Sequence, residues 1–474
     1  KRKMCLLKKI LAFFNIDKIS KFTSFPGPTP KFPLGNLDLL LGQNPWEATS
    51  GLAHNYGNIY VIWFGSTPQI VVNSPDFFKQ ILDSKWLDYH KDSPLKQLTP
   101  VITKYTPFLA NQPQWKNMRA NNPFSAPWFE DWLKKQPEVI SSGMELTISE
   151  LAVKSRAQNI DLTQDLQRVS FDSFSLSVAG KYLPDYVYKL FVSLGKTGSK
   201  RLVNPFILSF VLNPFFYLKR KFWLGYFEKL ITQAENAENP LADDLIQWTS
   251  RKGATISDAS LIANTANVFY GGVYSVTSNF ATVIWLLSQP ENKIYAEKLK
   301  KEIKSVLKNK KAISKLELDK MEFLDKVIRE AMRLLPPVPF YSRNSSETQV
   351  VFLKDEAMNK EYKIPMNTPI ILSNYFLHRT EEHWKDALIF NPERWTSEVI
   401  KNNPYGSDYF FPFGRGPRSC MGMPYALIFL RTAIASFYSK ARFEPSNEGK
   451  YEQGFFFGVM MPTGLKGKVV LDSD

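Results

Sequence analysis

Cysteine and histidine are scarce in this chain of 474 residues, which has only Cys5, Cys420 and four histidines. Two cysteines exclude a disulfide framework, and so low a number is typical of a reducing compartment, so the cytoplasm is the expected location. Four histidines leave little material for a metal site built from imidazoles. Any metal is therefore expected to arrive inside a cofactor.

Long apolar runs are missing as well. The stretch 259–290 carries no charged side chain, but it contains Asn264, Asn267 and several serines and threonines, too many polar groups for a lone helix in lipid. The pair Gly271-Gly272 would weaken an ordinary helix by about 1 kcal/mol per glycine. We therefore predict a buried central helix beside a ligand, not a membrane span.

The N-terminal segments differ from the rest of the chain. Residues 1–24 combine a basic cluster with apolar residues at helical spacing, which predicts an amphipathic helix that touches a membrane surface peripherally. Residues 25–36 are rich in proline, which forbids a helix and favours a stiff, extended hinge. Residues 37–474 show no internal repeat and no linker, so we expect a single catalytic domain.

Acidic residues are outnumbered, with 45 Asp and Glu against 60 Lys and Arg, giving a formal charge of +15. Such a charge favours acidic proteins, anionic lipid or nucleic acid as partners. Zinc-finger spacing, a basic region followed by heptads and an RNA-recognition sheet signature are all missing, so nucleic acid is not an expected partner.

The order of hydrophobic patterns predicts a mainly α fold with a minor β-sheet. Strand-like runs occur at 60–65 and 69–72, helical periodicity dominates from about 140 to 335, and strand-like runs return near 349–353 and 368–373 and at the C-terminus. The aromatic share of 14% suits a packed interior or a pocket for apolar ligands.

A loop rich in glycine and proline, 411–422, presents Cys420 just before an apolar helical run. The following helix N-terminus and Arg418 would both favour the thiolate. Its glycines would let the backbone approach the sulfur closely. A buried structural cysteine is the alternative for an isolated residue, but the spacing around Cys420 argues against it.

That spacing, F-G-x-G-x-R-x-C-x-G at Phe413, Gly414, Gly416, Arg418, Cys420 and Gly422, resembles the haem-binding loop of the cytochrome P-450 family. Five further matches follow in the family's order and cover nearly the whole chain. The first two are W-x-x-x-R at Trp115 and Arg119 and E-x-x-R at Glu330 and Arg333. The others are the stretch 334–343, which ends at Arg343, the pattern H-R-T-x-x-x-W from His378 to Trp384, and P-E-R-W with Arg394.

The resemblance implies a single-domain α+β fold and an oxidoreductase that holds haem b. Cys420 would be the axial thiolate ligand of the iron, which favours O–O cleavage, and Phe413 and Arg418 would contact the cofactor beside it. By the same matches, Trp115, Arg119 and Arg343 would hold the propionates. Glu330, Arg333 and Arg394 would form a buried structural triad.

The chain departs from the family in the central helix, where A/G-G-x-D/E-T falls on Gly271-Gly272-Val273-Tyr274-Ser275. Gly272 keeps its glycine, and we place it with Tyr274 and Ser275 at the catalytic position. A phenol is a poorer proton relay at neutral pH than a carboxylate. Tyr274 either alters proton delivery or only packs while water relays the protons.

Further aromatic residues fall where family members line the distal pocket, which suits a flat apolar or aromatic substrate. They are Phe269, Tyr270, Phe340, Tyr341, Phe456 and Phe457, together with Val459.

The resemblance implies O2-dependent monooxygenation of a small apolar, aromatic molecule, as in secondary metabolism. Electrons would come from a ferredoxin, a flavodoxin or an FMN-type reductase. Oxidative C–C or C–N coupling of aromatic units is the alternative, and a hydroperoxide isomerase is a third. A haem sensor without turnover is disfavoured because no segment is left over for an effector domain.

Overall fold

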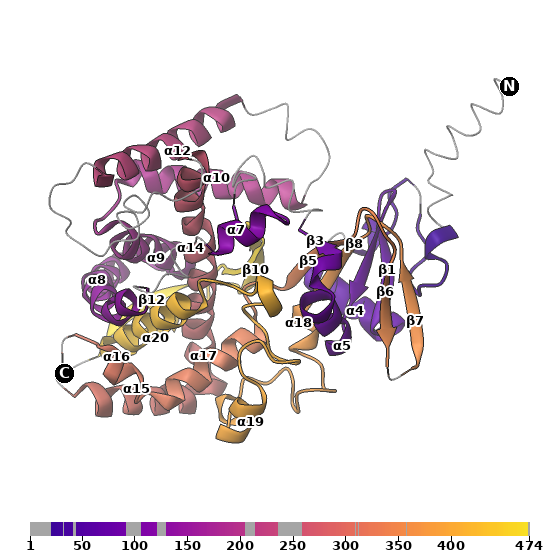
Figure 1. Ribbon diagram of the computed structural model, residues 1–474. Coiled ribbons are helices and arrows are strands. Elements are labelled where there is room, and N and C mark those ends of the chain that lie inside the picture. Colours follow the sequence, from indigo (N-terminus) through magenta and orange to yellow (C-terminus); the bar gives the residue numbers. More distant parts are fainter. Residues whose placement is uncertain are drawn as a thin grey trace. The chain divides into compact units, whose positions relative to one another are not determined.

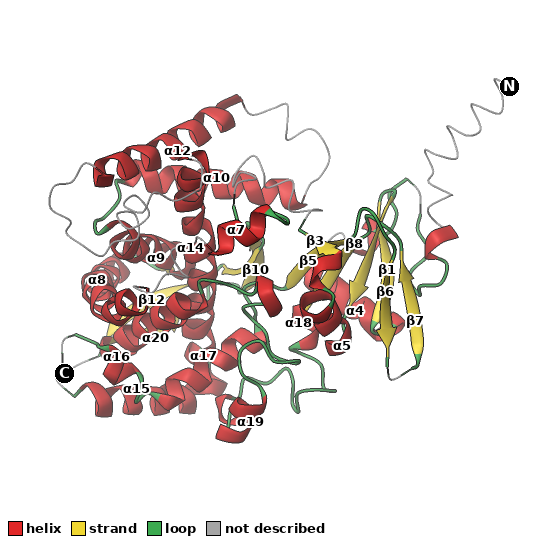
Figure 2. Cartoon of the chain, in the orientation of Figure 1, coloured by secondary structure: helices red, strands yellow, loops and turns green. Residues whose placement is uncertain are grey.

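The computed structural model describes residues 20–31, 33–40, 44–91, 106–120, 129–203, 214–235, 258–308, 310, 312–356 and 358–472. The chain folds into two compact units (Figures 1 and 2). We call Lys1–Pro94, Val338–Ile389 and Glu398–Cys420 the sheet unit, and Leu95–Pro337, Phe390–Ser397 and Met421–Asp474 the helical unit. Helices dominate and the sheets are small, as the sequence predicts.

The sheet unit is built on a five-stranded sheet in the order β1-β2-β8-β5-β3. Its strands are β1 (Ile59–Phe64), β2 (Thr67–Val72), β3 (Tyr89–His90), β5 (Phe340–Ser345) and β8 (Pro369–Ser373). β2 and β8 are parallel, and the other neighbours are antiparallel. The strand-like runs predicted at 60–65, 69–72 and 368–373 are therefore confirmed.

Both faces of β1 are buried, which explains its unbroken apolar sequence. Ile59, Val61 and Trp63 pack in one apolar cluster, and Tyr60 and Ile62 pack in another. The other elements of this unit are α3 (Leu37–Leu40), α4 (Pro45–Tyr56), α5 (Pro75–Lys79), a π-helical turn η2 (Gln80–Ser84), η3 (Trp86–Asp88), β6 (Val351–Asp355), β7 (Lys360–Ile364), α18 (Asn374–Leu377) and η8 (Gly416–Arg418).

The helical unit holds the long helices. They are α7 (Gln114–Ala120), α8 (Phe129–Ala157), α9 (Leu162–Ala179), α10 (Asp185–Val203), α12 (Pro214–Glu235), α14 (Asp258–Ser288), α15 (Lys293–Leu307), α16 (Lys315–Leu318), α17 (Glu322–Leu334) and α20 (Met423–Lys440). Its strands are β4 (Ile160–Asp161), β9 (Ala441–Pro445), β10 (Glu452–Phe456), β11 (Val459–Thr463) and β12 (Lys466–Leu471). Short helices η6 (Pro290–Asn292) and η7 (Pro392–Arg394) also belong to this unit, whereas η1 (Ser20–Phe22) and nearly all of α19 (Ser397–Asn402) belong to the sheet unit.

Helix α14 is the centre of this unit. It packs against α9, α12, α17, α20 and β11, so most of its circumference is covered by protein. This cover explains why the 31 residues of α14 include almost no charged side chain. Buried hydroxyl groups in it can bond to neighbouring backbone, as in Ser278, whose hydroxyl donates to the Met460 carbonyl at 2.5 Å. Within the described part of the chain, no helix is long and apolar enough to cross a bilayer.

Most of the predicted N-terminal helix, residues 1–19, lies outside the described residues. The proline-rich segment that follows is tied to β1 where it is described: the Val61 N–H donates to the Pro26 carbonyl at 2.8 Å. The Trp63 N–H donates to the Asn36 side chain at 2.9 Å. A hinge at 25–36 and a single domain from 37 onward remain predictions.

Candidate functional site

The cysteine loop folds tightly around two glycines with left-handed backbone. Gly414 has φ 73° and Gly416 has φ 69°, and a side chain on Gly416 would stand 2.1 Å from the Leu82 carbonyl oxygen. The Cys420 N–H donates to the Phe413 carbonyl at 2.8 Å, which closes the loop. Cys420 itself is exposed. The loop therefore presents the thiol outward from a fixed backbone.

Side chains of the sheet unit hold this loop from several sides. Arg415 forms ion pairs with Asp83, which lies in η2, and with Asp408. His378, which is fully buried, accepts the Phe411 N–H on Nε2 at 3.2 Å. Sequence reasoning missed Asp83 as an anchor because it lies 332 residues from Arg415 along the chain.

Three cations lie near one another in the sheet unit, where Arg343 is buried and Lys91 and Arg418 are half-buried. Burial, followed by the charge of Arg418, lowers the pKa of the Arg343 guanidinium to about 9. Burial, and then the charges of Arg343 and Arg418, lower the pKa of Lys91 well below its usual value. A carboxylate beside such cations would be attracted by all three charges. The arrangement is therefore suited to a ligand with carboxylate groups.

Lys91 was not predicted, although the strand register identifies it. β3 pairs with β5 through Tyr89 opposite Ser345 and His90 opposite Asn344. Continuing this antiparallel register by one step puts Lys91 opposite Arg343. The pairing partner of a two-residue strand is not visible in the sequence, which is why the signal was missed.

In the helical unit, Trp115 and Arg119 lie one turn apart on α7, and the guanidinium carbon is 5.8 Å from the indole centroid. Trp115 is buried and Arg119 is half-buried. The i,i+4 spacing thus brings the two predicted propionate-binding side chains to one helix face.

The predicted triad is assembled around Glu330, which is completely buried. Its carboxylate accepts two hydrogen bonds from Arg333 and one from Arg394 Nε, all at 2.9 Å. The Asn391 N–H and the Trp395 indole N–H add one bond each at 3.0 Å. Trp395, which stands where the family pattern has Phe, therefore supplies a fifth donor to a charge that burial would otherwise penalise.

Tyr274 is a packing residue in this structure. It is 1% exposed, its ring stacks on Phe191 of α10 at 4.8 Å, and a side chain on Gly195 would stand 2.0 Å from its hydroxyl oxygen. Burial raises the pKa of the Tyr274 phenol, so it stays protonated at neutral pH. Of the two interpretations of Tyr274, the geometry favours packing.

Phe269 and Tyr270 are also buried, among aromatic rings of neighbouring helices. Phe269 lies 5.0 Å from Phe174, and Tyr270 lies 5.1 Å from Phe191. The Tyr270 hydroxyl is buried without a hydrogen-bond partner, and burial raises the pKa of this phenol. These residues, which are predicted to line the pocket, pack against aromatic rings of α9 and α10.

The less covered face of α14 is small and polar. It carries Asn264, Asn267, Val268, Gly271 and Ser275, all half-buried or exposed. Asn264, Val268, Gly271 and Ser275 are three or four residues apart and form one stripe, about 60–120° around the helix from Tyr274. Asn267 lies at the edge of this stripe, nearer to Tyr274. The Ser275 hydroxyl donates to the Gly271 carbonyl at 2.7 Å. We call these five residues the polar stripe; the helical period alone could have identified it.

Gly272 lies beside the polar stripe and allows close packing. A side chain there would stand 2.6 Å from the Phe174 ring, so only glycine lets α9 approach α14 so closely. α14 runs without interruption through this position.

The remaining predicted pocket residues lie in three places. Phe457, at the tip of the β10–β11 hairpin, has φ 53°, donates its N–H to the Ser199 hydroxyl at 2.7 Å and stacks on Tyr270 at 4.6 Å. Phe456 is half-buried, and Val459 is buried. Phe340 and Tyr341 lie on β5, where the Tyr341 hydroxyl is bonded within the cysteine loop.

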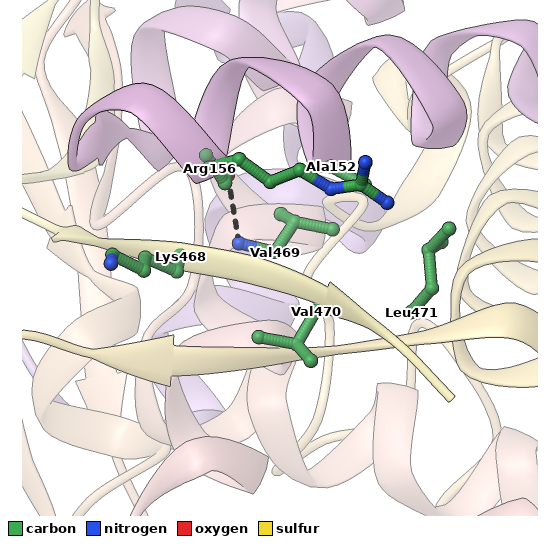
Figure 3. A pocket seen from close by; sticks show the side chains of 7 residues that line it. Ala152, Arg156, Lys468, Val469, Val470 and Leu471 are labelled. Carbon is green, nitrogen blue, oxygen red and sulfur yellow. Dashed lines mark hydrogen bonds between the residues drawn. The ribbon is translucent and has the colours of Figure 1, made fainter. Parts of the chain in front are cut away.

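A separate surface hollow of about 290 Å³ lies between α8 and β12 (Figure 3). It is lined by Ala152, Ser155 and Arg156 from α8 and by Lys468–Leu471 from β12. The Val469 N–H donates to the Ser155 hydroxyl at 2.9 Å, which ties the strand to the helix. Apolar side chains and two cations offer no acid–base pair, so this hollow has no catalytic role in our assignment.

Comparison with known proteins decides the family. The family model described as Cytochrome P450 matches residues 25–466. The chain belongs to the cytochrome P450 family. Members bind haem b through a cysteine thiolate, and this chain is accordingly a haem-thiolate oxidoreductase of the monooxygenase class. The predictions of family, fold class, enzyme class and cofactor are confirmed.

Curated relatives cover almost the full chain. Cytochrome P450 3A18 from Rattus norvegicus is 25% identical over 90% of this chain and 87% of its own. Ferruginol synthase 1 from Rosmarinus officinalis is 25% identical over 97% of this chain and 98% of its own. Lithocholate 6-beta-hydroxylase from Mesocricetus auratus is 26% identical over 88% of this chain and 84% of its own. Relatives with such different names leave the substrate of this P450 open.

Replacing Gly195 by alanine should destabilise the protein by about 1–3 kcal/mol, because the new methyl group collides with the Tyr274 hydroxyl. Thermal unfolding of the holoprotein measures this. Gly225→Ala on α12 is the matched control, since nothing lies within 4 Å of its added methyl group and alanine favours the helix. Equal melting temperatures for the two variants would contradict the packing role of Tyr274.

Trp395→Phe should cost about 1.5–3 kcal/mol of stability, because it removes one charge-assisted hydrogen bond from a buried carboxylate. Chemical denaturation of the holoprotein checks this. The control is Trp285→Phe, whose indole ring stacks on Tyr451 at 5.6 Å. A cost no larger than that of the control would show that the Trp395 N–H contributes nothing to the triad.

Proposed function

We propose that this P450 catalyses O2-dependent monooxygenation of a small molecule with an apolar, aromatic body and at least one hydrogen-bonding group. The observation that carries the proposal is the exposed Cys420 on a fixed loop, in the same unit as buried Arg343 and half-buried Lys91 and Arg418. A thiolate and a group of neighbouring cations match the iron and the two carboxylates of haem b.

The residues for holding haem follow from this match. Cys420 would ligate the iron, while Arg343, Arg418 and Lys91 would neutralise propionates, with Trp115 and Arg119 as further donors from α7. Phe413, whose carbonyl accepts the Cys420 N–H, would contact the porphyrin beside the sulfur. Bound haem supplies the activation of O2 and the transfer of oxygen. The chain itself would bind the haem, orient the substrate and supply protons.

Proton supply is assigned to Ser275 and water, not to Tyr274. Ser275 lies on the polar stripe and keeps its hydroxyl oriented by the Gly271 carbonyl. Tyr274 points its hydroxyl at Gly195 in the aromatic core. The Ser275 oxygen can accept a hydrogen bond from water, and the hydroxyl would pass on a proton after its O–H rotates away from the Gly271 carbonyl.

The polar stripe extends the substrate prediction. Among the described residues, Asn264 Oδ1 is buried with no hydrogen-bond partner, so a hydroxyl or N–H group on the substrate would satisfy it. Half-buried Phe340 and Phe456 remain candidates for contact with an aromatic body. The relatives do not favour oxidative coupling or hydroperoxide isomerisation over monooxygenation.

For electron supply we propose a ferredoxin, a flavodoxin or an FMN-type reductase. The formal charge of +15 suits an acidic carrier, because complementary charge speeds encounter.

Peripheral membrane contact is supported by α12. Tyr217, Leu218 and Phe222 are 51%, 50% and 61% exposed, and basic side chains at 219–221 lie among them. Exposed apolar residues mixed with cations are typical of a helix that touches anionic lipid. We propose a cytoplasmic enzyme that binds a membrane surface through α12 and the segment 1–24.

Incubation of the holoprotein with a surrogate ferredoxin, its reductase, 18O2 and a panel of indoles, phenols and fatty acids should give a product that gains one heavy oxygen. Cys420→Ala should abolish both turnover and the thiolate-type Soret band of the reduced carbon-monoxide complex. Cys5→Ala is the matched control and should retain both. An unlabelled dimeric product would replace monooxygenation by oxidative coupling, and activity in Cys420→Ala would refute the site.

The double substitution Leu218→Ser and Phe222→Ser should reduce binding to anionic phospholipid vesicles about tenfold, because less apolar surface enters the lipid. Co-sedimentation of the full chain measures the bound fraction. Ile294→Ser, at a residue of α15 that is 68% exposed, is the control. Binding that is unchanged by the double substitution would remove α12 from the membrane contact.

A further inference from the structure

The Tyr341 hydroxyl bridges the two ends of the turn that begins the cysteine loop. It donates to the Phe411 carbonyl at 2.7 Å and accepts the Gly414 N–H at 3.0 Å. Inside the same turn, the Gly414 N–H also donates to the Phe411 carbonyl at 2.9 Å. One phenol therefore contacts both backbone groups that define the turn.

The phenol itself is held by the sheet. Tyr341 lies on β5 opposite Leu372 of β8, and the Asn374 amide nitrogen is 3.5 Å from its hydroxyl while donating to the Val338 carbonyl at 3.0 Å. The same face of β5 carries Arg343 two residues further on, since side chains alternate along a strand. A rigid sheet thus positions both a buried cation and the phenol of the loop.

The turn determines where the sulfur is presented. The residue between Phe411–Pro412 and Gly414 is Phe413, whose carbonyl accepts the Cys420 N–H at 2.8 Å. Gly414 needs its left-handed φ of 73° for this path, and an added methyl group there would lie 3.9 Å from the Tyr341 ring. If the turn relaxes, the acceptor for the Cys420 amide moves with it.

We propose that Tyr341 is a positioning residue for the Cys420 thiolate and not a wall of the substrate pocket. Its hydroxyl fixes the turn 411–414, and through Phe413 it fixes the backbone of Cys420. The inference rests on Cys420 being the haem ligand. The Tyr341 hydroxyl bonds both backbone groups of this turn, and the sheet holds the ring in place.

The test is Tyr341→Phe in the full-length holoprotein, which keeps the ring and removes only the hydroxyl. We expect haem to transfer to an excess of a haem-accepting globin about three- to tenfold faster, as expected for the loss of one or two hydrogen bonds. The reduced carbon-monoxide complex should show a larger share of the band of a protonated or lost thiolate, and the haem reduction potential should shift. Tyr409→Phe, at a residue that is 40% exposed, is the matched control and should change none of these.

A second measurement does not depend on haem spectra. The Gly414 amide should exchange its hydrogen more slowly in the wild-type chain than in Tyr341→Phe, because the variant removes one of its acceptors. Equal exchange, together with unchanged haem loss and an altered substrate KM, would overturn the proposal and return Tyr341 to the pocket. A wild-type protein without a thiolate-type band would instead refute the haem assignment of Cys420, which separates the two failures.

Discussion

A cysteine sulfur can serve as an anionic ligand only if its backbone is fixed while its surface stays open, and the sheet unit is organised around this constraint. The loop 411–420 has little regular structure of its own, so its order comes from outside. His378, Tyr341 and the ion pairs of Arg415 each hold a different point of it. The buried faces of β1 make the sheet rigid enough to serve as that support.

Two groups of charged side chains differ in the charges around them. Glu330 has its full set of donors, so the triad is complete in the folded chain. Burial lowers the pKa values of Lys91 and Arg343, and the positive charge of neighbouring arginines lowers them further. A ligand with two carboxylates would bring negative charge to these cations, and binding that favours the folded state adds to its stability.

Sequence patterns identified what depends on local spacing. The cysteine loop, the i,i+3 pair Glu330–Arg333 and the strands around Gly65 all follow from residues close together in the chain. Sequence patterns did not identify features that depend on where a side chain points or on how two distant strands pair. Tyr341 was assigned to the pocket because position on β5 does not reveal where a phenol donates, and Lys91 was missed because β3 has only two residues. Tyr270 and Phe269 were assigned from family position, while the helical period that defines the polar stripe went unused.

In α14, Tyr274 stands where the family pattern has an acidic residue, and a change in packing explains this difference. A phenol at position 274 needs space that a carboxylate does not, and that space is provided by Gly195 on α10, where any side chain would collide with it. Phe457 and Ser199 complete the same contact by tying the β10–β11 hairpin to α10. Tyr274, Gly195 and the hairpin tip thus form one interdependent core around which α10 docks on α14. Because Tyr274, which replaces the acid, belongs to this core, the polar stripe with the less buried Ser275 hydroxyl is the part of α14 to which we assign the chemistry.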